Sequence, residues 1–208
     1  MIVLDFGSGE TCHNNKKIVK RMIEGLAAVD TRKKNVVIKW QLWSGAMPYA
    51  GGILKRLDPK IYQYAVDCGK EYGYETFSSV FDKESLDFLL STDPLFVKIA
   101  CRPELYSLAT RIEGTRFLVS VPPGNPHRLS LDIIKLCCIS NYPAEEGAYY
   151  KGFDRSALYC GISDHTTNFN LYNRYHPAVY ECHFKLPDSI GADSGDYART
   201  PEQLKEIL

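Results

Sequence analysis

Residues Val36-Val37-Ile38-Lys39-Trp40-Gln41-Leu42 form an apolar run that only Lys39 and Gln41 interrupt. Strands of a parallel sheet have this pattern, because helices cover both faces of the sheet and bury both sets of side chains. The flanking segments are helical in pattern. Residues 16–29 repeat apolar positions at helical spacing, and Asp58-Pro59 places a capping residue before a first-turn proline. The stretch therefore predicts a buried strand between two helices, the repeating unit of an α/β protein.

The same alternation continues along the whole chain. Apolar runs predict eight strands, at residues 2–6, 36–42, 74–81, 95–100, 115–121, 134–140, 157–162 and 179–184. Eight strands with eight crossovers predict a compact (β/α)8 TIM barrel. At 208 residues the chain is shorter than the roughly 250 typical of this fold, so crossovers in the second half must be shortened, such as the return through residues 125–131. A doubly wound open sheet is the alternative, but no GxGxxG follows the first strand.

The composition predicts one globular domain over residues 1–208. Apolar residues make up 45% and charged residues 24%, which argues against disorder. The 25 Lys and Arg residues balance the 25 Asp and Glu residues, so no overall positive field attracts nucleic acid or anionic lipid. Any anionic ligand must therefore be held by a local site.

The sequence contains no pattern typical of a membrane-spanning segment or of an oxidising compartment. The apolar runs are far shorter than the roughly 18 to 20 residues that span a bilayer. The first seven residues lack a basic leader and place Asp5 inside an apolar run, unlike a secretory signal. The seven cysteines are odd in number and include no CxxC pair. We therefore expect reduced thiols in a cytoplasmic protein.

Polar residues collect where the predicted strands end, which is where a barrel of this kind carries its site. Lys39 and Lys98 lie inside apolar strands, where a buried ammonium group is unfavourable unless it meets an anion or a carboxylate. One such lysine could equally point outward, but two suggest a shared anion. Hydroxyl groups at the strand ends offer further donors: Ser79, Ser120, Ser140 and Ser163.

Two histidines, His165 and His183, lie at the end of the seventh strand and in the eighth. With Asp164, Glu181 or Asp193 as a ligand or an orienting partner, they could bind one divalent ion and leave positions open for water and substrate. A single histidine is more often a satisfied core residue, so the spacing alone is a weak motif.

Several segments together resemble the N-acetylneuraminate (sialic acid) synthase family. The most specific are Gly161–Thr166, Glu181–Phe184 and Gly191–Asp193, which are similar to the family's G-x-S-D-H-T, E-K-H-F and G-P-D motifs. Four supporting segments occur in the family's order: Ile38–Gln41 for K-F-Q, Phe77–Asp82 for F-S-T-P-F-D, Lys98–Cys101 for K-I-A-S, and Cys138–Pro143 for C-V-S-x-Y-P.

The resemblance implies a transferase barrel that condenses phosphoenolpyruvate with an N-acyl amino sugar. It implies that His165 and His183 bind Mn²⁺ or Mg²⁺, and that Tyr142 and Asp193 lie near the sugar and the reacting centre. Gln41 matches a sugar-side contact, and Asp193 or Glu181 would assist proton transfer. The resemblance also assigns the phosphate and carboxylate of phosphoenolpyruvate to six residues: Lys39, Lys98, Ser79, Ser120, Ser140 and Ser163.

The chain departs from the family pattern at several places. Cys101 stands where the motif has serine, Cys182 stands where it has lysine, and the loop at residues 44–57 is short. The family's C-terminal antifreeze-like domain, which helps to close the sugar site across a dimer, is expected to be absent. A homodimer or a separate chain could then supply the lid.

The resemblance thus implies metal-dependent condensation of phosphoenolpyruvate with an N-acetylmannosamine-like amino sugar, giving a sialic acid-type nonulosonate and phosphate. No nucleic acid or membrane partner is expected. The alternative is a non-catalytic module that binds phosphoenolpyruvate or another anion. A third possibility is an aldolase that uses Lys98 or Lys39 as a Schiff-base amine.

Overall fold

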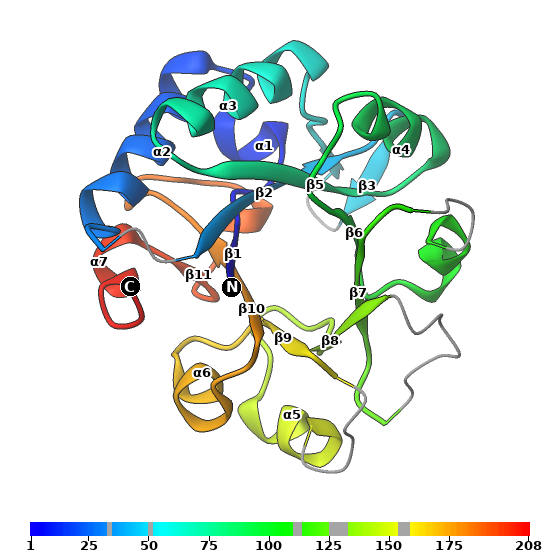
Figure 1. Ribbon diagram of the computed structural model, residues 1–208, viewed down its shortest axis with the longest axis vertical. Helices are drawn as coiled ribbons and strands as arrows, with labels where there is room; N and C mark the ends of the chain where they lie inside the picture. The colour runs from blue at the N-terminus through cyan, green and yellow to red at the C-terminus, as the bar shows by residue number, and fades with distance from the viewer. Residues whose placement is uncertain (33–34, 50–51, 110–113, 125–132, 154–158) are drawn as a thin grey trace.

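The computed structural model describes residues 1–32, 35–49, 52–109, 114–124, 133–153 and 159–208. Eight parallel strands form its centre: β1 (Ile2–Asp5), β2 (Val36–Leu42), β5 (Glu75–Val80), β6 (Val97–Ile99), β7 (Phe117–Val121), β8 (Ile134–Cys138), β9 (Gly161–Asp164) and β10 (Val179–Phe184). Each strand pairs with the next in this order, and β10 pairs in parallel with β1, so the sheet closes on itself (Figure 1). The predicted (β/α)8 barrel is confirmed.

Helices surround the barrel (Figure 1). They are α1 (Gly9–Cys12), α2 (Lys16–Val29), α3 (Pro59–Glu71), α4 (Lys83–Leu90), α5 (Glu146–Phe153), α6 (Asn170–Tyr175) and α7 (Pro201–Leu204), with two 3-10 helices, η1 (Pro103–Leu108) and η2 (Ala192–Ser194). The early helices begin at side-chain caps, Asn15 for α2 and Asp58 for α3. The later crossovers are short: α2 has 14 residues, whereas α5 has 8 and α6 has 6.

The strand period of two places an apolar layer directly beneath a polar one. Val3, Val37 and Phe77 belong to a buried cluster completed by Phe96, Leu118, Leu136 and Val179. Two positions further along β1, β2 and β5, the side chains on the same face are Asp5, Lys39 and Ser79, which line a cavity. The apolar cluster therefore fills the barrel below the cavity, and the larger core packs between the strands and the helices.

The structure also contains elements that the sequence analysis does not predict. The short loop after β2 holds an antiparallel hairpin of β3 (Met47–Tyr49) and β4 (Gly52–Leu54). A short strand, β11 (Ala198–Arg199), pairs in parallel with β10. These strands have only two or three residues each, and β3 and β4 are largely exposed, so they lack a buried apolar run.

Several predicted boundaries are too wide. The strand predicted at residues 95–100 is limited to β6, and the one predicted at 134–140 ends at Cys138. β9 begins at Gly161, and residues 157–158 of its predicted range lie outside the described residues. After β6 the crossover is the 3-10 helix η1, and the return predicted through residues 125–131 lies outside the described residues. Among the described residues, no helix is both long and apolar enough to cross a bilayer.

Candidate active site

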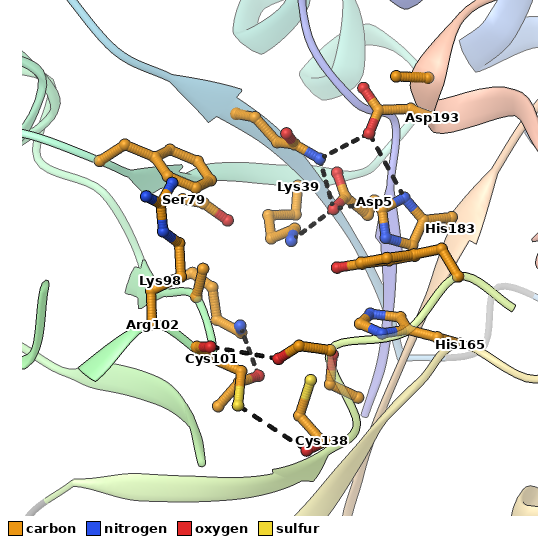
Figure 2. Close-up of a pocket in the computed structure, with 18 of the residues that line it drawn as sticks. Asp5, Lys39, Ser79, Lys98, Cys101, Arg102, Cys138, His165, His183 and Asp193 are labelled. Atoms are coloured by element: carbon orange, nitrogen blue, oxygen red, sulfur yellow. Dashed lines mark hydrogen bonds and ion pairs between the residues drawn. The ribbon is translucent and has the colours of Figure 1, made fainter. Parts of the chain in front are cut away.

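A cavity of about 730 Å³ opens at the carboxyl ends of the barrel strands. Every barrel strand, or the residue next to its end, contributes to its lining, because the strands are parallel and alternate side chains point inward. Figure 2 shows the side chains converging from segments far apart in the sequence. The cavity brings together twelve of the residues that the sequence singles out: Lys39, Gln41, Ser79, Lys98, Ser120, Ser140, Tyr142, Ser163, His165, Glu181, His183 and Asp193.

The deepest part of the cavity is a charged floor made of Asp5, Lys39, Lys98 and Glu181, all nearly fully buried. Lys39 Nζ lies 2.7 Å from Asp5 Oδ2 and 3.2 Å from Glu181 Oε1. Burial alone would lower the pKa of Lys39, but the two carboxylates outweigh it and raise that pKa. Burial would raise the pKa of Asp5, yet Lys39 and then His183 lower it to about 2. Lys39 is therefore a fixed positive charge.

Lys98 is held less tightly by carboxylates. Its Nζ donates to Ser120 Oγ at 2.8 Å and to the Ile99 carbonyl at 3.2 Å, and it lies 3.6 Å from Glu181 Oε1. Burial is the largest influence and lowers the pKa of Lys98 despite the charge of Glu181. An anion beside this ammonium group would offset its desolvation, so Lys98 is the position on the floor where added negative charge is most favourable.

Glu181 joins the two lysines. Its Oε1 accepts a hydrogen bond from Ser163 Oγ at 3.0 Å as well as the one from Lys39. Burial would raise the pKa of Glu181, but Lys39 and Lys98 together lower it. Its other oxygen, Oε2, is buried and has no hydrogen-bond partner among the described residues. A ligand that donates a hydrogen bond, or an ordered water molecule, would satisfy that oxygen.

The two predicted metal-binding histidines lie side by side on one wall of the cavity, because β9 and β10 are neighbouring strands, and their ring centroids are 5.4 Å apart. His165 Nδ1 lies 2.7 Å from the Ile139 carbonyl oxygen, so this nitrogen carries the proton and Nε2 keeps its lone pair. Burial, followed by the neighbouring His183, lowers the pKa of His165 to about 3, which keeps the ring neutral. His183 Nδ1 is buried without a hydrogen-bond partner among the described residues and lies 4.0 Å from Asp193 Oδ1.

This donor set suits a divalent transition ion that binds imidazole and carboxylate. The carbonyl contact of His165 is the kind of orienting contact that metal-bound histidines make through their second nitrogen. Within the described ranges, no three His, Cys, Asp or Glu side chains stand close enough together to hold an ion by themselves. The residues therefore fit an ion that takes two imidazoles from the protein and its remaining ligands from water or substrate.

Asp193 connects the site to the turn after β1. Its Oδ1 accepts from Gln41 Nε2 at 3.3 Å, and its Oδ2 accepts from the hydroxyls of Ser8 and Thr11 at 3.4 Å each. This approach requires glycine at position 7, which has φ +77°, because a Cβ there would lie 2.2 Å from Thr11 Oγ1. The Gly7-Ser8-Gly9 turn thus places α1 against η2 at the cavity edge.

One candidate partner of the histidines lies elsewhere. Asp164 does not line the cavity. It follows Ser163 in β9, so the strand period turns its side chain to the opposite face. There its carboxylate accepts from the Tyr180 hydroxyl at 2.6 Å and from the Thr166 backbone N–H at 2.7 Å. Asp164 therefore stabilises the outer side of β9 and the turn after it.

The cavity also holds residues that the sequence analysis does not select. Asp5 could have been selected from the sequence, because it is an acid inside an apolar strand. In the sequence analysis its position serves only as evidence against a secretory leader. Tyr197 and Arg102 come from segments without a distinctive pattern. Tyr142, which is 53% exposed, stacks on His165 with ring centroids 4.1 Å apart. The hairpin contributes rim residues: Met47, Pro48, Tyr49 and Leu54.

A closed parallel barrel with lysines, serines and two imidazoles in the cavity at its carboxyl end defines a TIM-barrel protein. No family model matches the chain. Pseudaminic acid synthase of Campylobacter jejuni is 24% identical over a 207-residue alignment that covers 86% of this chain. The chain spans 59% of the length of that relative.

Two solved structures match the fold over 99% of this chain. A spore coat polysaccharide biosynthesis protein E from Chromobacterium violaceum has a TM-score of 0.76 at 17% identity, and 71% of its chain is covered. N-acetylneuraminic acid synthetase of Leptospira borgpetersenii, solved with citrate, has a TM-score of 0.72 at 18% identity, with 80% covered. The chain is thus similar to the catalytic barrel of the sialic acid synthase-like family, as its motifs predict.

Proposed function

We propose that this barrel binds phosphoenolpyruvate on its charged floor and condenses it with an N-acetylmannosamine-like amino sugar, releasing phosphate. The observation that carries the proposal is the convergence of Lys39 and Lys98 with His165 and His183 in one cavity. The product would be a sialic acid-type nonulosonate. The distant relationship to pseudaminic acid synthase supports the same class of reaction.

Residues of the charged floor and residues of the cavity rim have different roles in this proposal. Lys39 and Lys98, with the serine hydroxyls beside them, hold the phosphate and carboxylate of phosphoenolpyruvate. His165 and His183 would hold Mn²⁺ or Mg²⁺, which when bound supplies Lewis-acid polarisation of the sugar aldehyde. Tyr142 at the exposed rim and Gln41 beside Asp193 would contact the sugar.

The proposed reaction forms one carbon–carbon bond. C3 of phosphoenolpyruvate attacks the aldehyde carbon, the carbonyl π electrons pass to the aldehyde oxygen, which takes up a proton and becomes a hydroxyl group, and positive charge develops at C2. Water then adds at C2, and the C–O bond to phosphate breaks with phosphate leaving. The proton of the attacking water goes to Asp193 or to Glu181, whose Oε2 has no hydrogen-bond partner among the described residues. The lysines stabilise the departing phosphate.

Phosphate release tests this proposal. The purified chain is incubated with phosphoenolpyruvate, N-acetylmannosamine and Mn²⁺, and each component is omitted in turn. We expect phosphate only from the complete mixture, and a chelator should stop it. Failure to bind phosphoenolpyruvate at all would overturn the proposal.

A non-catalytic anion-binding module is the second candidate. Burial lowers the pKa of Lys98 despite Glu181, so an anion beside this ammonium group is favourable whether or not a reaction follows. Binding of phosphoenolpyruvate without phosphate release across a panel of amino sugars would favour this module. Borohydride trapping of a carbonyl substrate on Lys98 or Lys39 would instead indicate the Schiff-base enzyme.

A further inference from the structure

Two cysteines meet at the side of the cavity (Figure 2). Cys101 follows β6 and Cys138 ends β8. Cys101 Sγ lies 3.8 Å from the Cys138 carbonyl oxygen, and both cysteines line the cavity. Ser140 Oγ donates to the Cys101 carbonyl at 3.3 Å, which ties the two segments together. The pair is thus a fixed feature of the cavity wall.

The two thiols have different environments. Cys101 is half-buried and lines the cavity, whereas Cys138 is 2% exposed. The hydrogen bond from Cys138 is the largest influence that lowers the pKa of Cys101 to about 6, and Ser140, Lys98 and Tyr106 act in the same direction. The same thiol–thiol hydrogen bond, together with burial, raises the pKa of Cys138. The accessible sulfur is therefore the better nucleophile, and the buried sulfur is held as its neighbour.

The remaining cysteines are either buried or outside the cavity. Cys12, Cys68, Cys137 and Cys182 are buried, and burial raises the pKa of each thiol. Cys160 is exposed but does not line the cavity. An oxidant that enters the cavity from solvent would thus meet Cys101 first.

We propose that Cys101 and Cys138 are a peroxide-reactive dithiol, with Cys101 as the attacking cysteine and Cys138 as the resolving cysteine. The Cys101 thiolate attacks hydrogen peroxide, an S–O bond forms, the O–O bond breaks, and hydroxide leaves and takes up a proton as water. Cys138 then attacks the sulfenic sulfur, the S–O bond breaks, and a second water carries away the Cys138 proton. Two electrons pass from the thiols to the peroxide. The inference concerns only the thiols and does not rest on the proposed condensation.

Peptide mapping of the full, reduced chain tests the dithiol directly. After treatment with hydrogen peroxide, we expect the loss of two of the seven thiols. Non-reducing digestion should yield a linked peptide containing Cys101 and Cys138, and dithiothreitol should cleave it. A treated chain with no such link, or with its first sulfenic acid on another cysteine, would overturn the proposal.

Adjacent alanine substitutions identify the resolving residue. Cys137 and Cys138 lie on one tryptic peptide, residues 136–151, and both are buried. Cys137→Ala should retain the link to Cys101. Cys138→Ala should abolish it and leave a Cys101 sulfenic acid that dimedone captures. The opposite pattern would assign the role to Cys137 and contradict the proposal.

A measurement on the unsubstituted chain avoids any effect of substitution on folding. The rate of iodoacetamide labelling at Cys101 should be half-maximal near pH 6, because the thiolate is the reacting species. Labelling at Cys101 that still rises between pH 8 and 9, as roughly expected for an ordinary thiol with a pKa of about 8.5, would contradict the assignment of Cys101 as the attacking cysteine.

Discussion

Asp5 and Lys39 lie opposite each other on β1 and β2 and form a buried ion pair, with 2.7 Å between Oδ2 and Nζ. The exposed fraction of either side chain is at most 4%. Removing one partner of such a pair leaves a buried charge without its counterion, which is strongly destabilising. Glu181 also contacts Lys39, so a substitution of Asp5 would still leave this lysine with one carboxylate partner.

Substituting Asp5 should therefore lower stability markedly. We expect Asp5→Asn to reduce the free energy of unfolding by about 3 kcal/mol. The matched control is Asp188→Asn, which removes a carboxylate that is 65% exposed and pairs with Arg21 on the surface. An exposed pair of this kind contributes little to stability, because water screens it. Urea unfolding measures both, and equal losses would show that the buried pair has no special importance.

Lys98 should determine the affinity for phosphoenolpyruvate. Lys98→Met removes a charge-assisted contact worth about 1.5–3 kcal/mol, so we expect the dissociation constant to rise roughly 10- to 100-fold. Lys83→Met is the control, because Lys83 is exposed and, among the described residues, its ion-pair partner is Asp87 on α4. Isothermal titration calorimetry would show this difference. Unchanged binding in Lys98→Met would remove Lys98 from the anion site.

The two histidines should be required for metal binding. We expect His165→Ala and His183→Ala each to lose bound Mn²⁺ while circular dichroism shows a folded chain. His176→Asn serves as the control, because His176 lies outside the cavity and has a positive φ of 41° that asparagine tolerates. Metal content after dialysis is the readout. If both alanine variants keep the metal, the ligand assignment is wrong.

Asp82 should make a pH-dependent contribution to stability. Its carboxylate accepts from the backbone N–H groups of Ser44 and Ser85, both at 2.7 Å, and caps α4. Burial would raise the pKa of Asp82, but these hydrogen bonds lower it. Its stabilisation is thus complete above the unfolded pKa of about 3.9 and is lost as pH falls through the lower folded value.

We expect Asp82→Ala to reduce the free energy of unfolding by about 2 kcal/mol at pH 7, with a smaller difference at pH 3. Asp67→Ala is the control, since Asp67 is exposed and its carboxylate accepts a hydrogen bond from Gln63 on its own helix. That variant should lose no stability at either pH. A deficit in Asp82→Ala that is constant with pH would exclude a role for the carboxylate charge.

The barrel could be predicted from sequence because its strands are buried on both faces. The ranges of β2, β10 and α2 agree with their predicted bounds, since long apolar or amphipathic patterns define them. The hairpin of β3 and β4 could not be predicted, because its exposed three-residue strands are formed by local pairing rather than by burial.

Some residues of the site could likewise be predicted from the sequence, and others could not. Lys39 and Lys98 could be selected because a lysine in an apolar strand requires a partner. Their partner Asp5 carries a similar signal, but the pairing depends on strand order in the closed barrel, which brings β1 and β2 together. Tyr197 could not be selected, because it enters the cavity from an irregular segment near the chain's end.

A crystal structure determined after soaking with phosphoenolpyruvate and Mn²⁺ tests the central claim most directly. The account predicts the phosphate and carboxylate of the ligand within hydrogen-bond distance of Lys39 and Lys98, and the ion bound to His165 and His183. A ligand bound outside the cavity, or an ion that contacts neither imidazole, would contradict it.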